Sequence, residues 1–193
     1  MDDRDGETAV RAARAAAEAE TEGRSADISL PPSFSVRGGV FVTISKHPSG
    51  DLRGCIGYPE PLFPLSEALL NSAVSACHDS RFPDLTREEA SGCTFSVTFL
   101  TAPLRIGCSS PEDLMSKIKI GRDGLIIDLH GRKGLLLPQV PVEWNWDVAE
   151  YLARLSVKAG LREDAWTDPG AKISAFQGEI FSEASPYGEI KRG

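Results

Sequence analysis

Residues 39–58, GVFVTISKHPSGDLRGCIGY, decide how the rest of the chain is interpreted. GVFVTIS is rich in β-branched and aromatic residues and predicts a strand, KHPSGD supplies turn residues, and LRGCIGY returns as a second strand. The stretch therefore predicts a β-hairpin. Two glycines flank a cysteine in the second strand, although strand interiors usually avoid glycine because it packs no side chain and loses the most backbone freedom on folding.

The second strand of this hairpin carries a thiol and a cation. Because side chains alternate along a strand, Arg53 and Cys55 are expected to share one face, while Leu52 and Ile56 point the other way and suit a core. A neighbouring guanidinium favours the thiolate form of cysteine and makes the sulfur a better nucleophile. The same residues also fit a structural role, with Cys55 as a small filler and Arg53 in a salt bridge.

The two glycines around the thiol have two interpretations as well. Gly54 and Gly57 can let another backbone or a ligand come close, or they can mark a β-bulge. A single cysteine without an identifiable histidine base is weak evidence for nucleophilic catalysis. The pattern therefore favours a pocket lined by Cys55 over a catalytic Cys55.

The remaining segments alternate between hairpins, helices and strands. Alanine-rich residues 8–23 predict a helix, and the tail at residues 185–193 is expected to be loosely tied. The other predicted elements are a helix in 64–80, a capped turn at Thr86–Glu89, a strand at 94–100, a helix begun by Ser110, a hairpin at 124–138 turning at Gly131 to Gly134, a helix capped by Asn145, and a last strand within 171–181.

This order repeats a hairpin–helix–strand unit and indicates internal duplication. Hairpins favour antiparallel pairing, so the predicted class is α+β, with a mainly antiparallel, curved or barrel-like sheet and flanking helices. We expect a single domain over residues 1–193, with two sub-lobes at about 24–104 and 105–181 and the N-terminal helix packed on them.

Composition narrows the class of function. The net charge of −7 argues against a general nucleic-acid binder, and no apolar run approaches the roughly 18 residues that span a bilayer. The acidic N-terminus lacks a signal-peptide core, so a cytoplasmic protein is expected. No Cys-x-x-Cys pair or histidine spacing suggests a metal site, and Cys77, Cys93 and Cys108 are interpreted as small buried residues. No cofactor motif is present.

Four further residues are candidates for ligand binding. Arg81 and Phe82 can clamp an anion or stack on a planar ligand, or they can anchor a loop at a helix end. Gln139 can bond a ligand through its amide, although a tie between a loop and a strand edge is favoured. Lys158 complements the dipole of its helix, and contact with a phosphate or carboxylate is the second interpretation.

The segments LRGCIG, DSRFPDLTREE, GLLLPQV, NWDVAEYL and KAGL, together with Trp166, resemble the AMMECR-one (AMMECR1) domain family over nearly the whole chain. The resemblance implies an α+β fold around an antiparallel, barrel-like sheet, and a cleft lined by the hexapeptide. Family activity is not established. Microbial members often accompany genes for Memo-type and radical S-adenosylmethionine proteins, which implies a shared modification pathway. This chain departs from many relatives at Ala90, where they have leucine, and at Ser96, where they have an acidic residue, so a carboxylate cannot be assumed at position 96.

Three hypotheses about function follow, and the residues leave open whether the protein is an enzyme. In the first, an enzyme uses Cys55 as a thiolate, with Arg53 and Arg81, on a small anionic or nucleotide-like substrate. In the second, the same cleft is a non-catalytic adaptor or regulatory module that binds a Memo-type or radical S-adenosylmethionine partner. RNA binding is the weakest, because the net charge opposes it.

Overall fold

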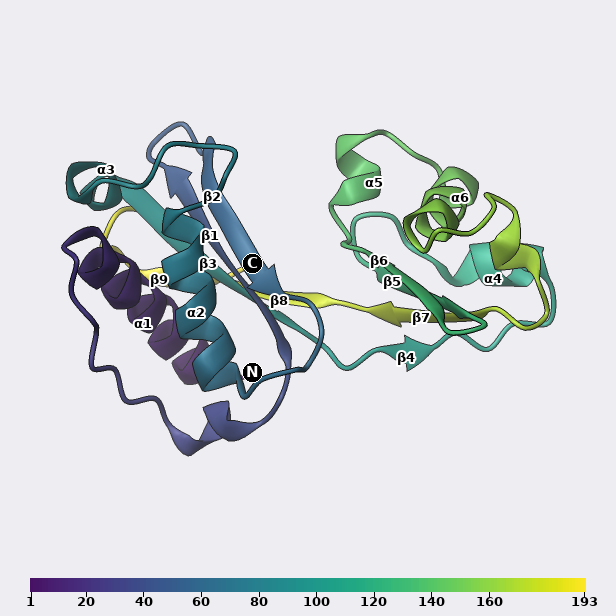
Figure 1. Cartoon of the computed structure of the whole chain (residues 1–193), viewed down its shortest axis with the longest axis horizontal. Coiled ribbons are helices and arrows are strands. Elements are labelled where there is room, and N and C mark those ends of the chain that lie inside the picture. Colours follow the sequence, from purple (N-terminus) through teal and green to yellow (C-terminus); the bar gives the residue numbers. More distant parts are fainter. The chain divides into compact units, whose positions relative to one another are not determined.

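The computed structural model describes residues 1–193, which fold as two compact units. The first unit comprises residues 1–100 together with 179–193, and the second comprises residues 101–178 (Figure 1). The chain therefore leaves the first unit once and returns to it for its last fifteen residues.

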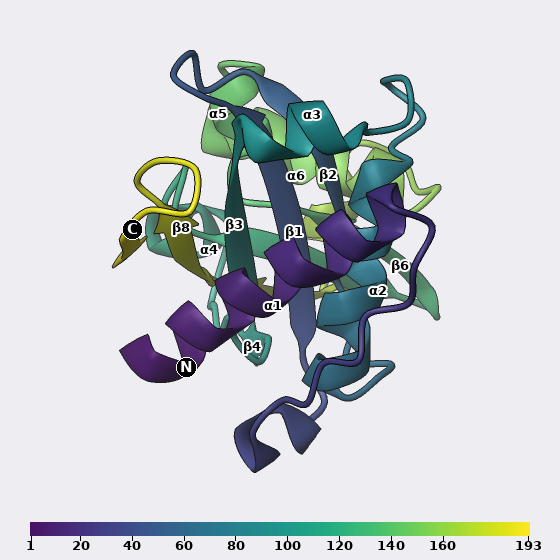
Figure 2. The same cartoon turned by 90° about the vertical axis from the view of Figure 1, so that its left-hand side faces the viewer.

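The first unit is a five-stranded sheet with helices on one face. Its strands lie in the order β2-β1-β3-β8-β9, and α1 and α2 cover the same face of the sheet (Figure 2). Alternate side chains of β1 and β3, including Val42, Ile44 and Val97, are fully buried on that face. The elements are α1 (Asp3–Thr21), η1 (Pro32–Ser35), β1 (Gly39–Lys46), β2 (Leu52–Tyr58), α2 (Leu65–Cys77), α3 (Arg87–Ser91), β3 (Cys93–Leu100), β8 (Gly178–Glu183) and β9 (Ile190–Arg192).

The C-terminal residues are more ordered than the sequence suggests. The stretch predicted as one last strand, 171–181, divides at Gln177 into two strands that belong to different sheets. The tail is not loosely tied, because β9 pairs antiparallel with β8 and Arg192 forms an ion pair with Asp3 of α1. Buried Glu183 also accepts two hydrogen bonds from buried Arg14 of α1, at 2.8 and 2.5 Å. These contacts fasten the returning segment to α1.

The second unit is a four-stranded sheet in the order β4-β7-β5-β6, and α6 packs on β5 and β6. Tyr151, Leu152 and Leu155 of α6 are fully buried, and the Tyr151 hydroxyl lies 3.1 Å from the carbonyl oxygens of Asp123 and Leu136. The elements are β4 (Leu104–Arg105), α4 (Pro111–Lys117), β5 (Gly124–Leu129), β6 (Arg132–Leu136), α5 (Val140–Glu143), α6 (Val148–Lys158), η2 (Ala165–Thr167) and β7 (Lys172–Phe176).

Both units contain the same hairpin–helix–strand arrangement. The hairpin β1–β2, helix α2 and strand β3 give the order β2-β1-β3, and the hairpin β5–β6, helix α6 and strand β7 give the order β6-β5-β7. The predicted α+β class, the antiparallel pairing and the repeated unit are confirmed. The barrel-like form is not observed, because the strands form two separate sheets.

The predicted helix caps and hairpin turn agree only in part with the structure. The capping box of Thr86 and Glu89 and the Ser110 N-cap are confirmed. The predicted cap at Asn145 is wrong: Asp147 caps α6 by accepting the Glu150 N–H, and Asn145 lies two residues earlier in a left-handed conformation. The second hairpin turns at residues 130–131, both with positive φ, rather than at Gly131 to Gly134.

Candidate functional site

A β-bulge sets the direction of the side chains at the start of β2. Ile44 pairs with Gly54, but the next residue of β1, Ser45, pairs with Leu52, so Arg53 is the extra residue. An inserted residue breaks the alternation of faces. Leu52 is consequently 37% exposed and Arg53 only 3% exposed, so the prediction that Leu52 packs in the core is wrong.

Arg53 is turned toward α3 and the segment before it, on the side of the sheet that the helices cover. Its Nε and Nη2 atoms donate to the two carboxylate oxygens of Glu89 at 3.3 and 2.8 Å, and Nη2 also donates to the carbonyl oxygens of Pro83 and Asp84 at 2.9 and 3.2 Å. The Arg53 guanidinium lowers the pKa of the Glu89 carboxyl, and the bond to Glu89 raises the pKa of Arg53. Arg53 therefore ties β2 to α3.

Gly54 allows the end of α2 to approach β2. A Cβ atom placed on Gly54 would lie 2.2 Å from the carbonyl oxygen of Ala76, the next-to-last residue of α2. Gly134 of β6 has the equivalent place in the second unit, where a Cβ atom would lie 2.8 Å from the Leu155 carbonyl oxygen of α6. Gly54 is thus required for the packing of a helix on a hairpin, and this explains the glycine inside the strand.

The backbone of Cys55 lies at the free edge of the sheet and is held by two side chains. Asp79 Oδ2 accepts the Cys55 N–H at 2.9 Å, and Arg81 donates to the Cys55 carbonyl oxygen at 3.4 Å. Asp79 is 3% exposed and binds the Arg81 guanidinium through both carboxylate oxygens, at 3.0 and 2.6 Å. That guanidinium, together with the backbone N–H groups of Cys55 and Arg81, which also donate to the carboxylate, holds the pKa of Asp79 far below its usual range. The ion pair occupies hydrogen-bonding groups of an otherwise open edge.

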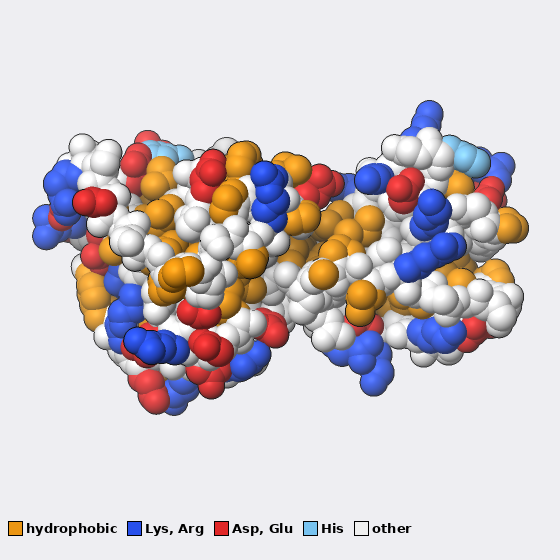
Figure 3. Space-filling model, turned by 90° about the horizontal axis from the view of Figure 1, so that it is seen from below, with side chains coloured by type: hydrophobic (Ala, Val, Ile, Leu, Met, Phe, Trp, Pro, Cys, Tyr) orange, Lys and Arg blue, Asp and Glu red, His pale blue; other side chains and the backbone are white.

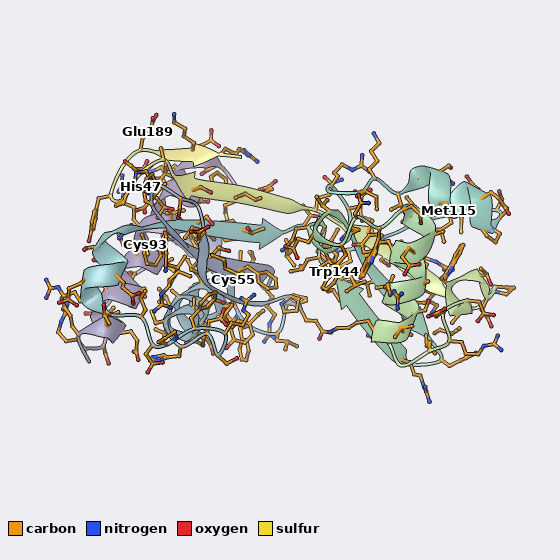
Figure 4. All side chains as sticks on the ribbon, turned by 90° about the horizontal axis from the view of Figure 1, so that it is seen from above. His47, Cys55, Cys93, Met115, Trp144 and Glu189 are labelled. Carbon is orange, nitrogen blue, oxygen red and sulfur yellow. The ribbon has the colours of Figure 1, made fainter.

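The Cys55 side chain lies on the outer face of the sheet, opposite the helices (Figure 4 labels Cys55 on β2). It is half-buried, and its cross-strand partner Thr43 places Oγ1 3.2 Å from Sγ, where the hydroxyl can donate to the sulfur. The neighbouring cross-strand pair is Phe41 and Gly57, and a Cβ atom on Gly57 would lie 2.4 Å from the Phe41 ring. We call the surface formed by Phe41, Thr43, Cys55 and Gly57 the Cys55 face.

The remaining predicted site residues are divided between the two units. The Phe82 ring contacts both predicted site arginines, with its centroid 5.8 Å from Arg53 Cζ and 5.7 Å from Arg81 Cζ. Gln139 and Lys158 belong to the second unit. Gln139 is exposed and precedes α5, whose Glu143 N–H bonds its carbonyl oxygen, and Lys158 is exposed in the last turn of α6.

Three residues that hold Arg53 or Cys55 in place were not predicted as site residues from the sequence. The sequence pattern places Asp79 only within the predicted helix at 64–80, Glu89 in a capped turn and Thr43 in a strand. Cys108 was predicted to be buried but is exposed, whereas Cys77 and Cys93 are buried as expected. No group of three or more His, Cys, Asp or Glu side chains is arranged to hold a metal ion.

The fold and the motif define a two-unit α+β protein with a repeated hairpin–helix–strand arrangement. The family model described as AMMECR1 matches residues 9–181, so the chain belongs to the AMMECR1 family. Protein MJ0810 of Methanocaldococcus jannaschii is 49% identical over 188 residues, which is 96% of this chain and 94% of that protein. Protein PH0010 of Pyrococcus horikoshii is 48% identical over 166 residues, 84% of this chain and 80% of that protein.

The crystal structure of uncharacterized protein PH0010 is similar to the present fold. The TM-score is 0.82 with 44% sequence identity, covering 100% of this chain and 98% of that one. None of the helices combines the length and the apolar character that crossing a bilayer needs.

Proposed function

We propose that the first unit is a non-catalytic binding module and that it recognises a segment of a partner protein at the Cys55 face. The observation that carries this proposal is the orientation of Arg53, whose guanidinium is bound to Glu89 and to two carbonyl oxygens on the helix-covered side. The group beside the Cys55 sulfur is instead the Thr43 hydroxyl. A hydroxyl can hold a thiol in place, but it is a poor base for taking its proton.

The chemistry of the Cys55 face suits a segment of protein. The Phe41 ring offers apolar contact, and the Thr43 hydroxyl and the Cys55 thiol offer hydrogen bonding. Acidic and basic side chains are interspersed over the visible face of the first unit (left in Figure 3), and the chain has a net charge of −7. This distribution supports a protein partner over a nucleic acid. The family resemblance suggests a Memo-type or radical S-adenosylmethionine protein as the partner.

The binding proposal is tested by blocking the face in folded protein. Purified Memo-type and radical S-adenosylmethionine proteins from the same organism are titrated calorimetrically with the Cys108→Ser variant, before and after treatment with N-ethylmaleimide. We expect binding by one of them, and at least a tenfold loss of affinity after alkylation of Cys55. The matched control, Cys55→Ser with Cys108→Ser, should bind with unchanged affinity and be insensitive to the reagent. Binding that survives alkylation, or no binding by either protein, would contradict the proposal.

An enzymatic role for Cys55 remains the second candidate, because the thiol is partly exposed and accepts a hydrogen bond. The substrate would be a small anionic or nucleotide-like molecule. The exposed Cys108 provides an internal reference for reactivity. A thiol activated for catalysis should react with iodoacetamide at least tenfold faster than Cys108 at neutral pH, whereas equal or slower reaction favours the binding module.

A further inference from the structure

The second unit contains a cavity of about 510 Å³ that lies entirely within residues 105–173. One wall is the loop that joins β4 to α4, and the other is the segment from Trp166 to Ala171. Leu114 and Ile173, which are 2% and 4% exposed, lie among the apolar side chains of its lining. A volume of this size is typical of sites that enclose a small organic molecule.

The loop between β4 and α4 is held in place by its own hydrogen bonds. Asp113 accepts from the backbone N–H and the hydroxyl of Ser109, at 2.8 and 3.1 Å. Lys117 donates to the Gly107 carbonyl oxygen at 2.6 Å and to Asp113 at 3.0 Å. At the other end of the loop, the Ile106 N–H bonds the Ile173 carbonyl oxygen of β7. This wall is therefore preformed, so that little ordering is needed when a ligand enters.

Two side chains of the lining keep unused hydrogen-bonding capacity. The Arg105 guanidinium and the Trp166 indole N–H make no hydrogen bond or ion pair in the structure. Asp168, the acidic side chain of the lining, accepts the Gly170 N–H at 2.7 Å and is thereby fixed in its turn. One cation and one fixed carboxylate in the lining favour a ligand with a single negative charge. A second negative charge on the ligand would have no cation to pair with and would be repelled by Asp168.

We propose that this cavity binds a small monocarboxylic acid with a flat apolar body. Arg105 pairs with the carboxylate, and Trp166 contacts the flat body while Leu114 and Ile173 contribute apolar surface. A guanidinium is suited to this task because its geometry matches both oxygens of a carboxylate. The proposal concerns the second unit and is independent of the Cys55 face.

The test uses naphthalene-2-carboxylate as the probe, with the neutral naphthalene-2-carboxamide and the dianionic 2-naphthyl phosphate for comparison. Each is titrated into the ¹⁵N-labelled full chain, and the Kd is read from the shift of the Trp166 indole resonance. We expect the carboxylate to bind at least tenfold more tightly than either analogue. Arg105→Gln should remove this preference and leave amide binding within about twofold. Arg154→Gln, which removes an exposed α6 arginine outside the cavity, is the matched control and should change neither value.

A second measurement follows the exposed thiol of the lining. In a Cys55→Ser background, saturating carboxylate should slow the alkylation of Cys108 by iodoacetamide at least fivefold, because Cys108 borders the same cavity. The proposal is overturned if millimolar carboxylate moves no Trp166 resonance, if the three probes bind equally, or if Arg105→Gln retains the preference. Failure of the Cys55 alkylation experiment has no bearing on these results.

Discussion

The substitution Gly54→Ala tests whether the central glycine of the LRGCIG motif serves packing or chemistry. The added Cβ atom would lie 2.2 Å from the Ala76 carbonyl oxygen, against about 3.4 Å for an ordinary contact, so β2 or the end of α2 must move by about 1.2 Å. Overpacking of this kind costs about 1–3 kcal/mol, and the backbone obstacle places Gly54 near the upper end of that range. Alanine also restricts the unfolded chain, which stabilises the folded state by about 0.4–1 kcal/mol. The free energy of unfolding should therefore fall by about 2 kcal/mol in total.

The matched control for Gly54 is Gly92→Ala in the same unit. A Cβ atom on Gly92 meets its nearest neighbour, the Glu89 carbonyl oxygen, at 3.6 Å, and its φ of −95° suits any residue. The control should therefore be neutral or slightly stabilised. Urea unfolding followed by circular dichroism gives both values. If Gly54→Ala loses no more stability than Gly92→Ala, the packing argument is refuted and the glycine must be explained by an approaching ligand.

Two further predictions concern titratable groups. Cys77 and Cys93 should resist iodoacetamide in the folded protein while Cys108 reacts, because burial raises the pKa of Cys77 to about 12 and also raises that of Cys93. Mass spectrometry after labelling with and without urea measures this difference. Rapid labelling of Cys77 or Cys93 without urea would contradict the prediction. The carboxylates of Asp84 and of Glu20 in α1 raise the pKa of His78. The contact therefore stabilises the folded protein below about pH 6.5, and this stabilisation is lost as the pH rises through the folded-state pKa of His78. The Tm difference between wild type and His78→Asn should therefore be larger at pH 6 than at pH 8, and a constant difference would exclude the linkage.

Local rules predicted the elements whose signals lie within a few residues. The capping box at Thr86, the N-cap at Ser110 and the strand at 94–100 depend on neighbours along the chain, and all three agree with the structure. The face of Arg53 could not be predicted in this way, because the alternation rule assumes an uninterrupted register and the bulge inserts one residue. The pairing of β9 with β8 was also missed, since a short polar strand has little sequence signal before its partner is known.

The edge contact at Cys55 was hidden for a different reason. Asp79 and Arg81 follow a helix in the sequence and carry no strand signal, yet they bind the N–H and carbonyl groups of Cys55 from 24 and 26 residues away. Sequence patterns show which residues can form an ion pair. They do not show that the pair will occupy the edge of a particular strand.

Comparison of the two units separates the scaffold from the site. In both hairpins an isoleucine pairs with a glycine, Ile44 with Gly54 and Ile127 with Gly134, and each glycine faces the end of the helix that packs on its hairpin, α2 or α6. The glycine is therefore part of a repeated scaffold. The first hairpin differs from the second in two respects. Its bulge buries Arg53, the residue before Gly54, and the residue after Gly54 is Cys55, whereas leucine follows Gly134 in the second hairpin. Changes at Gly54 should consequently act on stability, and changes that block the Cys55 face, such as alkylation of the thiol, should act on binding.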